Sequence, residues 1–123
     1  MRVASTFTAF GAAAALGAVA AMPLPAAAHH GWSNYDSGKA MTVTAPVVKS
    51  DYGHPHGTLT IESDGARWLV ILAPPSRMTN RGLTPEAIAA SETVTVEGYP
   101  ARNGDKEMRA ERITAGGKTV ELR

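Results

Sequence analysis

Hydrophobic and polar residues alternate along several short stretches of this chain, a pattern that predicts half-buried β-strands. In the clearest stretch, from Thr58 to Glu62, Leu59 and Ile61 share one face and polar residues occupy the other. The Asp64-Gly65 pair that follows is typical of a tight hairpin turn. Further strands are predicted at 41–49, 67–73, 93–97, 108–114 and 119–122.

The predicted strand at 67–73 is apolar on both faces. Trp68 and Val70 lie on one face, and Leu69 and Ile71 lie on the other. Two apolar faces are typical of a strand at the centre of a sheet that is covered on both sides. We therefore expect this strand to be central and covered twice.

One region is predicted to be helical, and prolines precede it. Pro74 and Pro75 end the preceding strand, because proline lacks the amide hydrogen that regular structure needs. The helical region covers residues 76–90 and is interrupted at Gly82. Beyond the interruption, Thr84 followed by proline and glutamate is typical of an N-cap, a first helical position and an acidic first turn.

The order of elements predicts an all-β fold. Three strands, a short helix and two or three more strands match a small OB-like barrel of five to six strands, with its helix between strands three and four. A closed barrel has no free sheet edges, which suits a small domain without disulfides. A β-sandwich with a short helical insertion is the alternative.

The first 28 residues have the layout of an export signal. Arg2 gives a basic start, a nearly charge-free stretch runs to Met22, and prolines follow. Signal peptidase prefers small residues one and three positions before the cut, and Ala28 and Ala26 satisfy both positions. We expect removal of residues 1–28, no membrane span afterwards, and a periplasmic or secreted mature chain.

The mature chain is predicted to contain an irregular arm at 29–40 and a single β-barrel domain at 41–123. Trp32 and Tyr35 are the apolar residues that can hold the arm against the barrel.

Later in the chain, Arg109 alternates with charged neighbours in a strand and is expected on an exposed, salt-bridged face.

The composition of the chain argues against several classes of function. The whole sequence has 12 basic and 11 acidic residues, and loss of Arg2 leaves equal numbers, which argues against nucleic acid as a partner. There is no cysteine, so thiolate metal sites and cysteine catalysis are excluded. No serine has the context of a catalytic nucleophile, and a small domain has little room for a deep substrate pocket.

Four histidines carry the candidate chemistry: His29, His30, His54 and His56. A cut after Ala28 makes His29 the first residue, whose α-amine and Nδ1 atom can chelate one metal ion. A third nitrogen from His54 or His56 would complete a T-shaped set, called a histidine brace. Copper(II) prefers such tetragonal nitrogen sites, and zinc is the alternative because imidazole suits it too.

Other residues can support such a site. His30 can bind copper through the terminal amine and the intervening backbone amide, or can hydrogen-bond to a ligand. Tyr35 and Asp36 are the nearest candidates to orient a ligand ring. Met78 and Met108 can supply soft sulfur to Cu(I), although methionine is more often core filler.

The chain resembles a family of unknown function made up of small exported bacterial proteins. The matching segments are Ala28-His29-His30-Gly31-Trp32-Ser33, Tyr35-Asp36, Pro55-His56, Ala73-Pro74-Pro75-Ser76-Arg77, Arg81-Gly82, Val94-Thr95-Val96-Glu97-Gly98-Tyr99 and Arg109-Ala110-Glu111-Arg112-Ile113. The family usually carries Asn-Pro-His, so His56 matches the pattern and His54 departs from it. The resemblance therefore makes His56 the better third ligand, and it implies no established activity.

These observations predict a periplasmic metal-binding protein that binds or delivers copper, rather than an enzyme. The alternative is a metal-free OB-like module that binds a peptide, a glycan or an envelope protein partner.

Overall fold

Six strands and three short helical segments make up residues 31–123, the part of the chain that the computed structural model describes. In chain order they are η2 (Trp32–Asn34), β1 (Met41–Asp51), β2 (Thr58–Ser63), β3 (Ala66–Ile71), α1 (Pro75–Asn80), η3 (Glu86–Ile88), β4 (Thr93–Pro100), β5 (Glu107–Ala115) and β6 (Lys118–Glu121).

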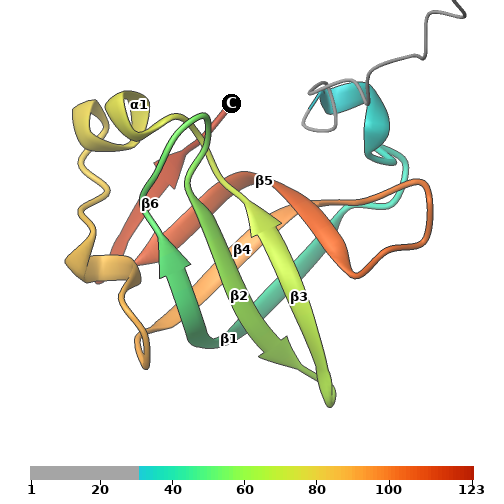
Figure 1. The fold of residues 1–123 in the computed structure, drawn as a ribbon, viewed down its shortest axis with the longest axis horizontal. Helices are drawn as coiled ribbons and strands as arrows, with labels where there is room; N and C mark the ends of the chain where they lie inside the picture. Colours follow the sequence, from blue (N-terminus) through green and yellow to red (C-terminus); the bar gives the residue numbers. More distant parts are fainter. Residues whose placement is uncertain (1–30) are drawn as a thin grey trace, which may run out of the picture.

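The first five strands close into a barrel (Figure 1). They follow the order β3-β2-β1-β4-β5, all antiparallel, and a parallel pairing of β3 with β5 joins the two ends. β6 extends the sheet by pairing with the later half of β5. With α1 between β3 and β4, this is the predicted OB-like barrel, and the sandwich alternative is wrong.

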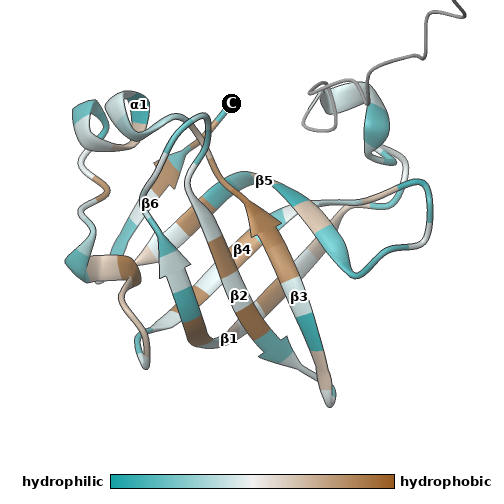
Figure 2. Cartoon of the chain, in the orientation of Figure 1, coloured by the Kyte–Doolittle hydropathy of each residue, from teal (hydrophilic) through white to brown (hydrophobic). Residues whose placement is uncertain are grey.

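The barrel interior is apolar, because the inward positions of the alternating strands carry aliphatic residues. Ile61, Val96 and Ile113 are completely buried, and hydrophobic positions recur along β1, β2 and β3 in Figure 2. Met78 and Met108 are also completely buried in this core, as expected of core-filling methionines.

The prediction that the third strand is covered on both sides is wrong in part. Val70 and Ile71 are buried, but Leu69 is 38% exposed. β3 is a barrel strand, so one of its faces points outward, and only part of that face is covered.

The helical region is shorter than its pattern predicts. α1 ends at Asn80, and the chain then turns through Gly82, whose φ of 86° is costly for any residue with a side chain. Thr84 acts as expected: its Oγ1 atom accepts a hydrogen bond from the Ala87 amide at 3.3 Å. Only a single 3-10 turn, η3, follows this cap, so no second α-helix forms.

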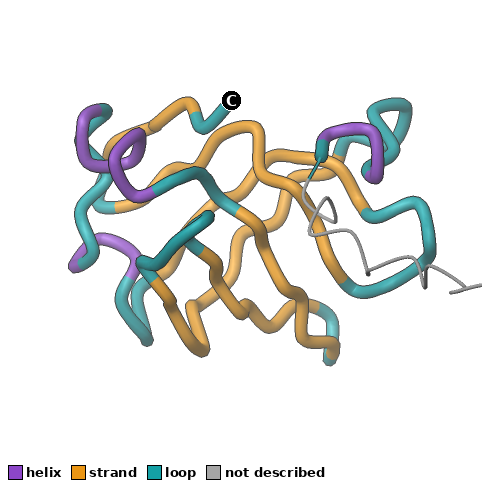
Figure 3. Tube along the Cα trace, turned by 45° about the horizontal axis from the view of Figure 1, so that its top comes forward, coloured by secondary structure: helices purple, strands orange, loops and turns teal. Residues whose placement is uncertain are grey.

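The arm is held against the barrel through the aromatic residues that were predicted to anchor it. Tyr35 is 1% exposed and pairs with Ala101 in an isolated antiparallel bridge. The Asp36 amide donates to the Pro100 carbonyl at 2.9 Å. In Figures 1 and 3, the arm and α1 lie outside the ring of strands, with the end of the chain at residue 123 between them.

Candidate functional site

The loop between β1 and β2 carries His54 and His56 and is fixed to the start of the α1 connector. The Gly57 amide donates to the Ala73 carbonyl, and the Leu72 amide donates to the Gly57 carbonyl, each at 2.8 Å. The segment is not extended, and its two histidines differ in environment. His54 is exposed, whereas His56 is half-buried.

His56 contacts an arginine on β5. The Nη2 atom of Arg109 lies 3.4 Å from Nε2 of His56. A guanidinium can only donate hydrogen bonds, so Nε2 is the acceptor in this contact and the imidazole is neutral. The lone pair of Nε2 is thus directed at Arg109, so a metal ion that binds this nitrogen must displace the hydrogen bond.

Arg109 is buried, which corrects the prediction that it lies on an exposed face. Its exposed fraction is 4%. Burial lowers its pKa, the charge of nearby Arg77 lowers it further, and the influence of Tyr35 opposes both. Arg112, three residues later, has a side chain that is 36% exposed, and it pairs with Glu97 at 3.6 Å and Glu121 at 2.8 Å.

Trp32 brings the arm into contact with the same arginine, Arg109. Its ring centroid lies 4.7 Å from Cζ of Arg109 and 4.5 Å from Cζ of Arg123, and Tyr99 meets it edge-on at 6.2 Å. We call these four residues the Trp32 cluster. Cation–π contacts of this kind favour a fixed position for the arm, so Trp32 and His56 share Arg109 as a common neighbour.

Two arginines of the α1 region hold the C-terminal segment beside this cluster. Arg77 Nη1 donates to the Leu122 carbonyl at 3.1 Å. Arg81 Nη1 donates to the carbonyl oxygens of Glu121 at 2.7 Å and Arg123 at 3.0 Å. The C-terminal segment, which supplies Arg123 to the Trp32 cluster, is therefore fixed by two arginines of the α1 region.

The two residues predicted to orient a ligand ring are engaged within the arm and its neighbours. The Tyr35 hydroxyl donates to Oε2 of Glu107 at 2.8 Å. Asp36 accepts from the Gly38 amide at 3.0 Å and lies within 4.0 Å of both Lys39 and Arg102. Their contacts order the arm, and the orienting role stays a prediction.

Replacing Tyr35 with phenylalanine should lower the free energy of unfolding by about 1.5 kcal/mol, because the buried hydroxyl bond to Glu107 is lost. Burial, the hydrogen bond and the charge of Glu107 raise the pKa of Tyr35. Ionisation thus favours the unfolded chain, so this contribution is fully present below about pH 10 and declines above it. Urea unfolding between neutral and alkaline pH measures both effects.

Tyr99→Phe is the matched control for that experiment, because the Tyr99 hydroxyl makes no hydrogen bond within residues 31–123. We expect it to change stability by less than about 0.5 kcal/mol. Equal losses in the two variants would contradict the role assigned to the Tyr35 hydroxyl.

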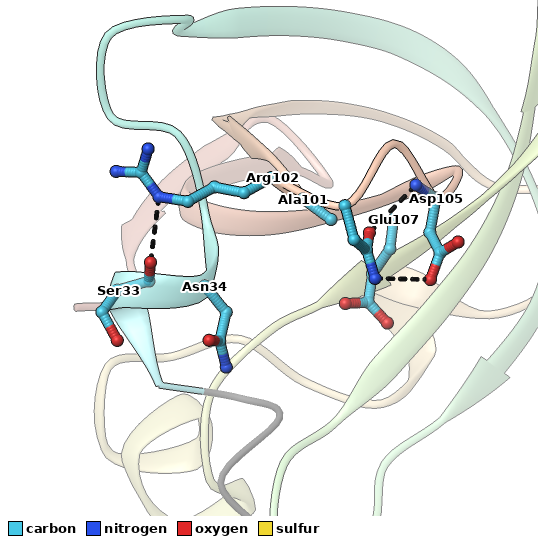
Figure 4. Close-up of a pocket in the computed structure, with 7 residues that line it drawn as sticks. Ser33, Asn34, Ala101, Arg102, Asp105 and Glu107 are labelled. Carbon is cyan, nitrogen blue, oxygen red and sulfur yellow. Dashed lines mark hydrogen bonds between the residues drawn. The ribbon is translucent and has the colours of Figure 1, made fainter.

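A polar pocket of about 410 Å³ opens between the arm and the loop that joins β4 to β5. Figure 4 shows Ser33 and Asn34 on one side and Asp105 and Glu107 on the other. Arg102 crosses between them, and its Nε atom donates to the Ser33 carbonyl at 3.0 Å. The mixture of carboxylate, amide and guanidinium groups suits a polar ligand.

The predicted metal ligands are only partly within the described structure. His29 and His30 lie outside the described residues. Within residues 31–123, no three His, Asp or Glu side chains come close enough together to hold a metal ion. No helix in that same range is sufficiently long and apolar to cross a membrane.

Sequence reasoning missed the role of Arg109. Strand alternation predicts an outward side chain between Met108 and Ala110, which are both fully buried. The outward direction is correct, but the arm covers the position. The one available signal was Trp32, an aromatic residue that needs a surface to pack against.

Comparison with known proteins identifies the family. No curated protein matches the chain. The model of a family of unknown function, DUF6152, matches residues 15–110 and so spans the arm, His56, Arg109 and most of the barrel. Since this match covers most of the sequence, the chain belongs to the DUF6152 family of unknown function.

Proposed function

We propose that this protein binds copper between its mature N-terminus and His56, after export and removal of residues 1–28. The observation that carries the proposal is the shared contact of Arg109 with Trp32 and His56. Two residues lie between His29 and Trp32, so their two Cα atoms can be at most about 11 Å apart. This short connection supports the proposal that the chelating terminus reaches His56.

The donor set suits copper. An α-amine and an imidazole from His29, with a neutral imidazole from His56, are three nitrogen ligands of the kind that copper prefers. The α-amine has a reference pKa close to 8, so a metal can displace its proton near neutral pH. Zinc accepts the same nitrogens, and His30 offers a further donor to either ion.

His54 is proposed as an accessory ligand only. It lies two residues from His56, but it is exposed, and no hydrogen bond or ion pair from residues 31–123 holds its ring. His56 is half-buried beside Arg109 and is therefore better prepared to bind. Because of this difference, replacing each histidine in turn should change the affinity for copper to a different extent.

The role proposed for the protein is binding or delivery in the periplasm or outside the cell. The pocket of about 410 Å³ lies between the arm and the β4–β5 loop, and the loop that carries His56 does not line it.

The direct test is a Cu(II) titration of the mature protein, with its first residue confirmed by mass spectrometry. His56→Ala should weaken Cu(II) binding by about tenfold or more, since one of three ligands is lost. His54→Ala is the matched control, and it should change the affinity by less than about threefold. Equal binding by wild type and His56→Ala would overturn the proposed ligand set.

A second candidate is a metal-free OB-like module that binds a peptide, a glycan or an envelope protein partner. The polar pocket between the arm and the β4–β5 loop favours it. Nearby, Trp68 and Lys106 contribute an aromatic ring and a cation 4.9 Å apart. A mature protein that binds no metal but shows ligand-induced shifts in Asn34 and Trp68 would favour this reading.

A further inference from the structure

We infer that two polar pockets beside the β4–β5 loop bind a neutral oligosaccharide. The inference rests on the second candidate function, for which it names the ligand, and it is independent of the proposed copper site. One pocket is the space of about 410 Å³ between the arm and the loop, and the other has a volume of about 240 Å³. The two share Ala101, Arg102 and Asp105 as lining residues, and we call them the paired pockets.

The paired pockets have walls that are already fixed by hydrogen bonds. The Arg102 amide donates to the Asn34 carbonyl, and Nε of Arg102 donates to the Ser33 carbonyl, each at 3.0 Å. Within the loop, Nδ2 of Asn103 donates to Oδ2 of Asp105 at 2.9 Å, and the Asp105 amide donates to Oδ1 of Asn103 at 3.0 Å. An ordered site loses less conformational entropy when a ligand binds.

The charges of the lining favour an uncharged ligand. Among residues 31–123, three carboxylates and three cations line the paired pockets: Asp36, Asp105, Glu107, Lys39, Arg102 and Lys106. A polyanion such as a nucleic acid would be repelled by the carboxylates, and a polycation would be repelled by the lysines and the arginine. A neutral ligand meets neither repulsion.

The hydrogen-bonding groups of the lining match sugar hydroxyls, which both donate and accept. Carboxylates accept, a guanidinium donates, and side-chain amides do both. Glu107 accepts the Tyr35 hydroxyl, and a carboxylate has roughly four acceptor sites, so capacity for a ligand is left. Trp68 adds an aromatic surface, with Lys106 Nζ 4.9 Å from its ring centroid, against which the C–H face of a sugar ring can pack.

A peptide fits these walls less well. Extended peptides commonly bind by adding a strand to a free sheet edge. At the end of β4 the arm already pairs with the main chain: Tyr35 forms a bridge with Ala101, and the Asp36 amide donates to the Pro100 carbonyl at 2.9 Å. The Ala101 amide donates to the Glu107 carbonyl, also at 2.9 Å. The main chain here is engaged within the protein, so the side chains are left to recognise the ligand.

The test is an NMR titration of the 15N-labelled protein with a chelator present, so that metal binding does not contribute. The probes are maltotriose, cellotriose and chitotriose, each at about 10 mM, a concentration that would nearly saturate a millimolar site. At least one should shift the amide signals of Gly104 and Asp105 and the indole signal of Trp68. The amide of Gly65, in the β2–β3 turn and outside both pockets, should not shift.

Asp105→Asn should weaken binding of the best trisaccharide by about fivefold, because a charged acceptor becomes a neutral one of the same shape. Asp64→Asn is the matched control. Both aspartates are exposed, Asp64 lies outside the paired pockets, and asparagine tolerates the φ of 50° at that position. Asp64→Asn should bind with the affinity of the wild type, and the amide spectra of both variants report folding.

The outcomes separate this inference from both candidate functions. If none of the three trisaccharides shifts the pocket signals, or if Asp105→Asn binds as tightly as the wild type, the inference is overturned. If capped trialanine shifts these signals and the sugars do not, the inference is overturned while the second candidate function stands with a peptide as its ligand. Because the chelator removes metal, the result does not depend on whether the protein binds copper.

Discussion

Gly98→Ala is expected to lower the free energy of unfolding by about 3–4 kcal/mol. Gly98 faces Ala110 where the β4–β5 register shifts, so the two main chains approach closely. A Cβ atom at position 98 would collide with the main chain of Arg109 and Ala110. Backbone cannot rotate away as a flexible side chain can, so β4 and β5 must separate locally.

Gly65→Ala is the matched control for this substitution. Gly65 lies in the β2–β3 turn with a φ of 74°, and nothing lies within 4 Å of an added Cβ atom. Its cost is therefore conformational only, about 1 kcal/mol. Urea unfolding of both variants measures the difference, and a Gly98 variant no less stable than the Gly65 variant would contradict the close approach of β4 and β5.

A single alanine added before His29 is expected to weaken Cu(II) binding by about a hundredfold or more, because the α-amine no longer belongs to the histidine and the chelate ring is lost. The variant is made without the leader, by a protease that leaves a defined first residue. Isothermal titration with Cu(II) and electron paramagnetic resonance compare it with the native terminus.

The internal control in that experiment is stability without metal. Trp32 and Tyr35 hold the arm against the barrel, and the added residue precedes both, so it should leave the thermal midpoint unchanged. If the extended chain bound Cu(II) as tightly as the native one, the terminal amine would not be a ligand, whatever the result for His56→Ala.

The fold was predictable because its local signals agree with its topology. Alternation defined β2, the Asp64-Gly65 turn defined the hairpin, and the paired prolines ended β3. The region after α1 was less predictable. Thr84 formed its cap as expected, but the chain continued for only one 3-10 turn before β4. Capping signals mark where a helix can begin and carry little information about its length.

The site was less predictable, because tertiary contacts decide the environment of its central residue. Strand alternation correctly directs Arg109 outward, and an outward arginine is ordinarily solvated. Here Trp32, far away in the sequence, covers it. His56 was recognisable as a candidate ligand, whereas its neighbour Arg109 was not, because no local sequence pattern shows what the arm will pack against.

Trp32 contacts both Arg109 of β5 and Arg123 near the C-terminus. These contacts determine where a purification tag can be attached. A purification tag at either terminus would crowd the Trp32 cluster, and a tag at the N-terminus would also block the terminal amine. The β2–β3 turn lies at the opposite end of the barrel from the C-terminus in Figure 1, and an affinity peptide inserted beside Gly65 would leave the C-terminal surface untouched.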